Sequence, residues 1–330
     1  MLKFALLDPR PIPAAIEANN AVFDGGQVLG IEVTVPALAA RCSLGNIDPQ
    51  HLAGNAHLTA IEAVMSITVP QDGAVLATIR ADLDSVGAMA VLRMRAAARD
   101  SAILAAGTGE LLAGVDPNGW QPTGPLLERI SLVAEADRFA RGGYPGPRPL
   151  PTSDNRWPES GASAESSRPL AAIAAAVTDF RVPVADRVAT MEKWLLTGNE
   201  PESYRTQVER ERMDMIRALE DGSIEHHTEA TGIAIVKSAH RAATLVGYAS
   251  APVVVALNPE FRFGGGEPHA KFTVCQFTTE YLDLRAALAE LAELEPGWGG
   301  SPTIGGSPQG VSSTLSVEQV VDVIARHLRK

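Results

Sequence analysis

The chain has 330 residues, of which 45% are hydrophobic and 20% are charged, so its composition excludes a disordered protein. The formal net charge of −11 argues against a protein that binds the nucleic-acid backbone, although the sequence is compatible with a local basic groove. Two domains are expected at this length, and no apolar run reaches the roughly 18 residues that span a bilayer.

The first 150 residues carry the pattern of an α/β domain. A strand is predicted at 27–35 from its β-branched residues, and a helix at 56–67 from apolar residues at helical spacing. A short buried strand at 73–81 is followed, after a polar turn, by a helix at 84–106. Strand, turn and helix in this order predict a domain at 1–150 with a mostly parallel sheet flanked by helices.

Residues 151–220 are predicted to be a flexible loop and a helical linker. Before this segment, the helix expected at 126–143 ends at two glycines. The stretch at 144–169 that follows is rich in proline, serine and glycine, which is typical of a flexible loop. Residues 170–220 then have a helical pattern throughout, with dense mixed charge toward the end.

The last part of the chain, 221–330, is predicted to be a second, smaller α/β domain. Strands are expected at 233–239, 252–259 and 270–277, helices at 281–294 and 315–330, and a glycine-rich loop at 297–310. Ser316 is the expected N-cap of the terminal helix.

The number of cysteines and the first residues of the sequence indicate the expected cellular location of the protein. Only Cys42 and Cys275 occur, which predicts no disulfide framework. The first residues hold an apolar patch that breaks at Pro11 and is too short for a secretory signal. We therefore expect a cytoplasmic protein with no membrane contact. The sequence leaves open whether it is a monomer or a homodimer.

Two carboxylates follow the buried strand at 73–81. Asp82 and Asp84 lie two residues apart, so on an extended backbone both would face one side. Two carboxylates aimed together repel each other and one pKa rises, unless a cation lies between them. Oxygen ligands suit Mg²⁺ or Mn²⁺, so this pair predicts a divalent-metal site. The alternative is that Asp84 or Ser85 only caps the helix at 84–106 and that Asp82 is a turn residue.

The stretch Asp82-Leu83-Asp84-Ser85-Val86-Gly87-Ala88 resembles the first motif of the DHH phosphoesterase superfamily, in which an apolar strand ends in D-x-D, a small residue and G-S/A. The domain at 221–330 resembles the substrate domain associated with that family, in its strand, helix, glycine-rich loop and terminal helix. The matching loop positions are Gly299, Gly300, Ser301, Pro302, Gly305 and Gly306. The resemblance implies hydrolysis of phosphoester or phosphoanhydride bonds with one or two Mn²⁺ or Mg²⁺ ions.

Departures from the family pattern leave several functions open. The Asp-His-His triplet is absent between the first motif and the linker, and Thr78 or Arg80 stands near the place of the first-motif histidine. Ser301 replaces the loop histidine. Either other residues supply the ligands, or catalysis is lost and the chain is a nucleotide-binding or regulatory protein. A metal hydrolase with a non-phosphate substrate is a third reading.

The segment 45–57 is the best source of replacement ligands. Asp48 and His51 flank a proline-containing turn, and a carboxylate with an imidazole is a common divalent-metal pair. Asp137, in the helix predicted at 126–143, is a further ligand candidate. The alternatives are a tight turn with surface histidines, and pairing of Asp137 with a neighbouring arginine.

Candidate substrate-binding residues lie in the predicted second domain. They are Gly299, Gly300 and Ser301 of the glycine-rich loop, together with His240 and Arg241. Backbone N–H groups of a glycine-rich loop can bind an anion because no side chains obstruct them. His269 and Lys271 offer further contacts to an anion. A flexible surface turn and solvated side chains are the alternatives.

The sequence therefore predicts a metal-dependent phosphohydrolase with Mn²⁺ or Mg²⁺ as cofactor. Its expected substrate is a nucleotide, a short nucleic acid or another phosphorylated small molecule. The predicted metal ligands are Asp48, His51, Asp82, Asp84 and Asp137, and the predicted catalytic residues are Asp82, Asp84 and His51. The metal would lower the pKa of a bound water and make it the nucleophile.

Overall fold

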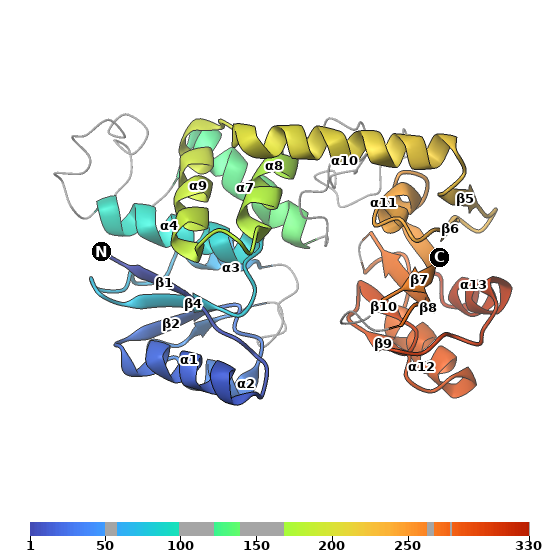
Figure 1. Ribbon diagram of the computed structural model, residues 1–330, viewed down its shortest axis with the longest axis horizontal. Helices are drawn as coiled ribbons and strands as arrows, with labels where there is room; N and C mark the ends of the chain where they lie inside the picture. The colour runs from blue at the N-terminus through green and yellow to red at the C-terminus, as the bar shows by residue number, and fades with distance from the viewer. Residues whose placement is uncertain (50–57, 99–121, 139–167, 263–266, 278, 330) are drawn as a thin grey trace. The chain divides into compact units, whose positions relative to one another are not determined.

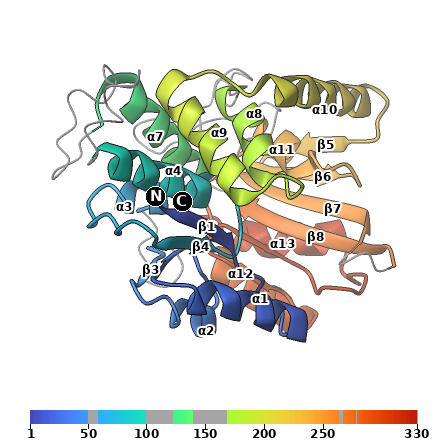
Figure 2. The same cartoon turned by 60° about the vertical axis from the view of Figure 1, so that its left-hand side comes forward.

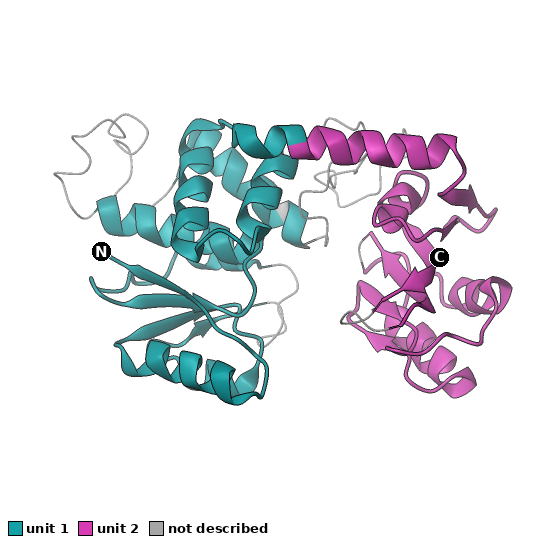
Figure 3. Ribbon diagram, viewed as in Figure 1, with its two compact units in different colours: residues 1–143, 169–206 teal, residues 144–168, 207–330 magenta. Residues whose placement is uncertain are grey.

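The computed structural model describes residues 1–49, 58–98, 122–138, 168–262, 267–277 and 279–329, which contain eleven helices and two sheets. These residues form two compact units (Figure 3), the first within 1–143 and 169–206 and the second from residue 207 onward. The boundary falls inside α10 (Glu202–Glu220), a helix with neither glycine nor proline. None of the described helices is long and apolar enough to cross a membrane.

The first unit is built on a sheet of four parallel strands. They are β1 (Lys3–Leu6), β2 (Val28–Ile31), β3 (Asn46–Ile47) and β4 (Val75–Thr78), in the spatial order β1-β4-β2-β3. All three neighbouring pairs run parallel. The central strands β2 and β4 are buried along their whole length, as expected where both faces of a sheet are covered. The parallel sheet predicted from the sequence is present in this unit.

Helices cover both faces of this sheet (Figures 1 and 2). α1 (Pro13–Asp24) and α2 (Pro36–Ala39) pack on one face. The other face carries α3 (Ala60–Ala63), α4 (Leu83–Ala98), α7 (Gly124–Arg138), α8 (Arg168–Thr178) and α9 (Val184–Thr197). Their shared core includes Met89, Ile173 and Trp194. α8 and α9, which the sequence analysis assigns to a linker, thus pack in the core of the first unit.

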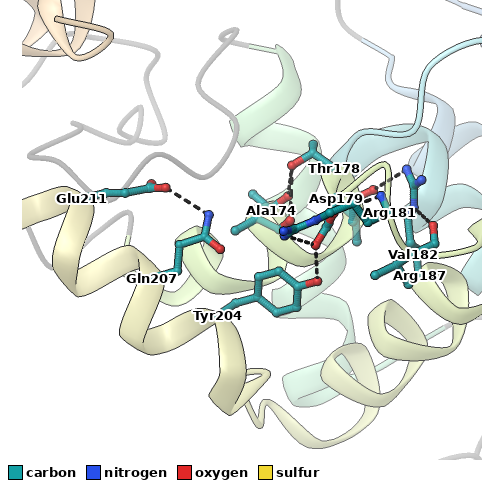
Figure 4. Close-up of polar contacts among 11 residues, drawn as sticks. Ala174, Thr178, Asp179, Arg181, Val182, Arg187, Tyr204, Gln207 and Glu211 are labelled. Carbon is teal, nitrogen blue, oxygen red and sulfur yellow. Dashed lines mark hydrogen bonds and ion pairs between the residues drawn. The ribbon is translucent and has the colours of Figure 1, made fainter.

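The turn between α8 and α9 is fastened to the start of α10 (Figure 4). The Tyr204 hydroxyl donates a hydrogen bond to Asp179 at 2.9 Å, and Arg181 forms an ion pair with Asp179 at 2.7 Å. The hydrogen bonds from Arg181 lower the pKa of Asp179, so this carboxyl is ionised. Arg187 donates to the carbonyl oxygen of Val182 at 2.6 Å. The first residues of α10 are therefore held as part of the first unit.

The second unit is built on a mixed sheet of six strands. They are β5 (Glu225–Thr228), β6 (Ile233–Lys237), β7 (Val253–Phe261), β8 (His269–Gln276), β9 (Gly299–Gly300) and β10 (Ile304–Gly306), in the order β5-β6-β7-β8-β10-β9. β6 and β7 are parallel, and the other neighbouring pairs are antiparallel. The expectation of a mostly parallel sheet therefore does not extend to this unit.

Each face of the second sheet has its own core. The helices of this unit are α11 (Ala243–Tyr248), α12 (Leu284–Leu294) and α13 (Val317–Arg326). α11 packs against β6 and β7 on one face, and α12 and α13 pack on the other around Phe272 and Leu291. The Ser316 hydroxyl accepts a hydrogen bond from the Gln319 N–H at 3.2 Å, which confirms Ser316 as the N-cap of α13.

Several predicted elements have different bounds in the structure. The strand predicted at 27–35 ends at Ile31, because Glu32 leaves the extended conformation. The glycine-rich loop predicted at 297–310 contains the hairpin of β9 and β10, which pairs with β8. The helix predicted at 56–67 is reduced to the four residues of α3 among those described. Most of the proline-rich segment at 144–169 lies outside the described residues.

Candidate metal centre

Acidic residues follow three neighbouring strands of the first sheet. Glu32 comes directly after β2 and Asp48 directly after β3. Asp82 lies in the connection from β4 into α4, and Asp84 lies in the first turn of α4. The carboxyl ends of parallel strands meet at one edge of a sheet, which is where sites form in open α/β folds. The topology therefore gathers negative charge at this edge.

Asp84 is fully buried in the first turn of α4. One carboxylate oxygen accepts a hydrogen bond from the Ala60 N–H at 2.6 Å, and the other accepts one from the Ile61 N–H at 2.8 Å. These N–H groups open α3, where backbone donors have no partner within the helix. Asp84 therefore joins α4 to α3 and is not the N-cap of its own helix.

Asp82 is the residue that caps α4. Its carboxylate accepts hydrogen bonds from the Ser85 N–H at 3.0 Å and the Ser85 hydroxyl at 2.8 Å, and it forms an ion pair with the exposed Arg80 at 3.7 Å. The expectation that both aspartates point to one side of an extended strand is wrong, since β4 ends at Thr78 and the helix begins at Leu83. Because the chain turns into a helix here, the carboxylates of Asp82 and Asp84 have different hydrogen-bond partners.

Among the described residues, Glu32, Asp84 and Asp137 form a group of carboxylates that could hold a metal ion. Each offers one oxygen, and these three oxygens all lie within 4.8 Å of one another. Glu32 and Asp84 are buried and Asp137 is partly buried. Asp137 lies in the last turn of α7, where the helix dipole disfavours a negative charge. We call these three residues the acidic cluster.

Burial and mutual repulsion keep protons on Glu32 and Asp84 in the absence of a cation. Burial, and then the charges of Asp84, Asp82, Asp137 and Asp48, raise the pKa of Glu32 to about 10. Burial and the charge of Asp137 raise the pKa of Asp84, against the opposing effect of its two backbone hydrogen bonds. Without a bound cation, the carboxyl groups gathered here are therefore not all ionised.

The backbone of Glu32 is strained. Its φ is 51°, and it is the one non-glycine residue with positive φ in the described part of the chain. A non-glycine residue in this region costs about 1–3 kcal/mol and is most often found at functional sites. The strained turn takes Glu32 out of the line of β2.

Sequence reasoning missed Glu32, although a signal was present. The apolar run Val28–Ile31 ends at this acid, just as the run Val75–Thr78 ends shortly before Asp82. The prediction of one continuous strand over 27–35 places Glu32 inside that strand and therefore does not identify it as a residue at a strand end.

The donor set of the acidic cluster fits a hard divalent cation. Its ligands are carboxylate oxygens, which Mg²⁺ and Mn²⁺ prefer. A cation there would offset the repulsion that raises the pKa of Glu32. Asp48, at the end of β3, is buried and contributes to the same negative field. His51 lies outside the described residues, so its part in ligation stays a prediction.

In the second unit, the predicted anion-binding loop contains the hairpin of β9 and β10. The Ser301 hydroxyl accepts hydrogen bonds from the N–H groups of Thr303 and Ile304, which closes the turn between β9 and β10. A Cβ at Gly300 would clash with the backbone of β10, and one at Gly305 would clash with Leu288 of α12. Close packing therefore explains both glycines without a ligand.

His240 and Arg241 are engaged within the second unit. The Ala242 N–H donates to the Nδ1 of His240 at 3.1 Å, and Arg241 forms an ion pair with Glu211 of α10. Burial first, and then the charge of Arg241, lower the pKa of His240. Their predicted contact with a phosphate stays a prediction.

No family model matches the chain, and it has no match among curated proteins.

Proposed function

We propose that this protein is a divalent-cation-dependent hydrolase of phosphorylated small molecules, with the acidic cluster as its metal site. The observation that carries the proposal is the buried approach of Glu32, Asp84 and Asp137 at the carboxyl edge of a parallel sheet. The D-x-D segment at Asp82 and Asp84 gives the proposal its reaction class, through the resemblance to the DHH phosphoesterases. Mg²⁺ and Mn²⁺ are the cations that the oxygen donors favour.

The residues of the chain would divide the work as follows. Glu32, Asp84 and Asp137 hold the cation, and the N–H groups of Ala60 and Ile61 fix the orientation of Asp84. Asp82 fixes the start of α4 and adds to the negative field around Glu32. A bound divalent cation supplies activation of water and charge neutralisation for phosphoryl transfer.

The test is turnover by the purified chain with Mn²⁺ or Mg²⁺ on nucleotides, dinucleotides, short oligonucleotides and pyrophosphate. We expect release of phosphate or of a nucleoside monophosphate from at least one substrate. Glu32→Gln, Asp84→Asn and Asp137→Asn should each reduce turnover by ~100-fold or more, since loss even of groups that only support metal ligands costs 10–100-fold. Asp72→Asn, at an exposed acid paired with the N-terminal amine, is the matched control and should have no effect.

Calorimetric titration with Mn²⁺ separates the outcomes. Absence of turnover together with absence of cation binding would reject the proposal. Cation or nucleotide binding without turnover on any substrate would instead support the nucleotide-binding or regulatory protein. Turnover that survives all three substitutions would show that the reaction takes place elsewhere in the chain.

A further inference from the structure

Lys271 of β8 is the one buried lysine in the described part of the chain, with an exposed fraction of 8%. Its ammonium donates a hydrogen bond to the carbonyl oxygen of Ser307 at 2.8 Å and lies 5.6 Å from the centre of the Phe261 ring. Burial alone lowers the pKa of Lys271, and no described carboxylate forms an ion pair with it. Lysine is almost never this buried unless it is paired with an anion.

The strand next to Lys271 brings glycine backbone close to its ammonium. Thr273 lies two residues along β8 and therefore on the same face of the sheet, and Gly306 is paired with Thr273. A Cβ at Gly306 would lie 3.5 Å from the Lys271 ammonium nitrogen and would clash with the carbonyl oxygen of Phe272, so this position requires glycine. Gly299 is paired with Gly306, and a Cβ there would meet no atom within 4 Å. Two adjacent glycines thus keep bare backbone next to the buried cation.

His269, the next residue on this face, has a hydrogen-bond partner at each ring nitrogen. Its Nδ1 bonds the carbonyl oxygen of Glu267 at 3.1 Å, and its Nε2 accepts a hydrogen bond from the Gly310 N–H at 3.3 Å. Both ring nitrogens of His269 are therefore engaged by backbone groups of the chain. The Lys271 ammonium, by contrast, has N–H donors beyond the one that it gives to Ser307.

We propose that Lys271, with the Thr273 hydroxyl and the bare backbone at Gly299 and Gly306, forms a binding site for a phosphate group. A buried, unneutralised cation is costly, and a bound oxyanion offsets that cost. A small tetrahedral anion can approach a glycine backbone closely enough to reach the ammonium. That this phosphate belongs to a substrate rests on the proposed function, whereas the binding itself does not.

The experiment is calorimetric titration of the full chain with inorganic phosphate and with phenyl phosphate, in EDTA and at low salt. We expect one saturable site. Lys271→Met should weaken binding by about 10-fold or more, the cost of a charge-assisted hydrogen bond. Thr273→Val should weaken it by a few-fold, which corresponds to one neutral hydrogen bond of about 1 kcal/mol. Lys237→Met is the matched control, since Lys237 is on the same sheet but exposed and within 4.0 Å of Glu225.

Hydrogen exchange of the wild-type chain provides a readout that does not depend on a variant folding. Phosphate should protect amides of β8, β9 and β10. Absence of saturable binding, or binding that Lys271→Met leaves unchanged, would overturn the site. Equal binding of acetate would overturn the phosphate assignment. Because the titration excludes divalent cations, Glu32→Gln should bind phosphate as the wild type does, so failure of the metal site and failure of this site are distinguishable.

Discussion

Glu32 combines a strained backbone with a buried carboxyl whose pKa is raised by burial and by the surrounding acids, so that it stays protonated. Each feature alone destabilises the fold, and together they indicate a residue retained for something other than stability. Asp84 differs, because its two hydrogen bonds to the start of α3 give it a structural role as well. The role of Glu32 is therefore tested by the pH dependence of stability, and that of Asp84 by the stability lost when its hydrogen bonds are removed.

Stability of the cation-free protein should fall as the pH rises. In the unfolded chain Glu32 ionises near the ordinary glutamate pKa of 4.5, whereas in the fold its pKa is about 10. Between these values the folded state binds more protons, so the free energy of unfolding falls with increasing pH, by up to ~1.4 kcal/mol per pH unit for one group. Glu32→Gln should make this slope shallower and leave the part that comes from Asp84, whose pKa is also raised in the fold. The measurement is urea unfolding in EDTA from pH 5 to pH 8.

The exposed Glu229→Gln is the control for this pH series and should keep the wild-type slope. If Glu32→Gln and the wild type fell in parallel, Glu32 would not be the group that holds the proton. Added Mn²⁺ should flatten the wild-type slope, because the cation takes the place of that proton.

Asp84→Ala should destabilise the fold more than Asp82→Ala. The first change leaves the N–H groups of Ala60 and Ile61 without their acceptor, at about 1–3 kcal/mol for each buried group. The second removes a helix cap, worth ~1 kcal/mol. Urea unfolding at pH 5, where fewer carboxylates are ionised, measures both. Equal effects would mean that Asp84 does not hold α3.

At the residue level, the sequence located part of the acidic cluster and mistook its geometry. A D-x-D after a buried strand marked Asp84, and the helix predicted at 126–143 included Asp137. The partnership of Asp84 with α3 was not predictable, because its hydrogen bonds join residues 23 and 24 positions apart in the chain. Glu32 was missed since its left-handed backbone ends β2 without a glycine to signal the turn.

Glycines at contacts between helices and strands show why composition alone does not predict a flexible loop. The segment at 297–310 has the composition of a flexible loop, yet Gly300 and Gly305 are required by close packing in a hairpin. Gly87, near the D-x-D segment, faces Ile61 and Met191 in the core, where no ligand can approach it. Local patterns predicted most of the long helices, whereas these contacts depend on which element lies across from the glycine.

Gly247→Ala should destabilise the second unit. A Cβ at residue 247 of α11 would clash with both methyl groups of Val254 in β7, and overpacking of this kind costs about 1–3 kcal/mol. The gain in helix propensity, of about 1 kcal/mol, offsets part of the loss. Gly299→Ala, where a Cβ meets no atom, is the control and should leave the melting temperature unchanged. A wild-type melting temperature for Gly247→Ala would show that α11 can shift on the sheet.

The whole molecule has separate cores in its two units, and this should appear in its thermal unfolding. The first core lies on the four-stranded parallel sheet, and the cores of the second unit lie on the six-stranded mixed sheet. We expect two calorimetric transitions. Mn²⁺ should raise the transition temperature of the first unit. Phosphate should raise the transition temperature of the second unit, which Gly247→Ala should lower. A single transition raised by both ligands would contradict this assignment.

α10 carries the chain across residues 206 and 207 as continuous hydrogen-bonded helix, without a glycine or proline. Proteases cut extended, locally unfolded backbone, and domain junctions are usually where they find it. This junction offers them none until helical turns open. Limited digestion would therefore leave the junction intact, so the fragments it yields would not reveal where one folded unit gives way to the next.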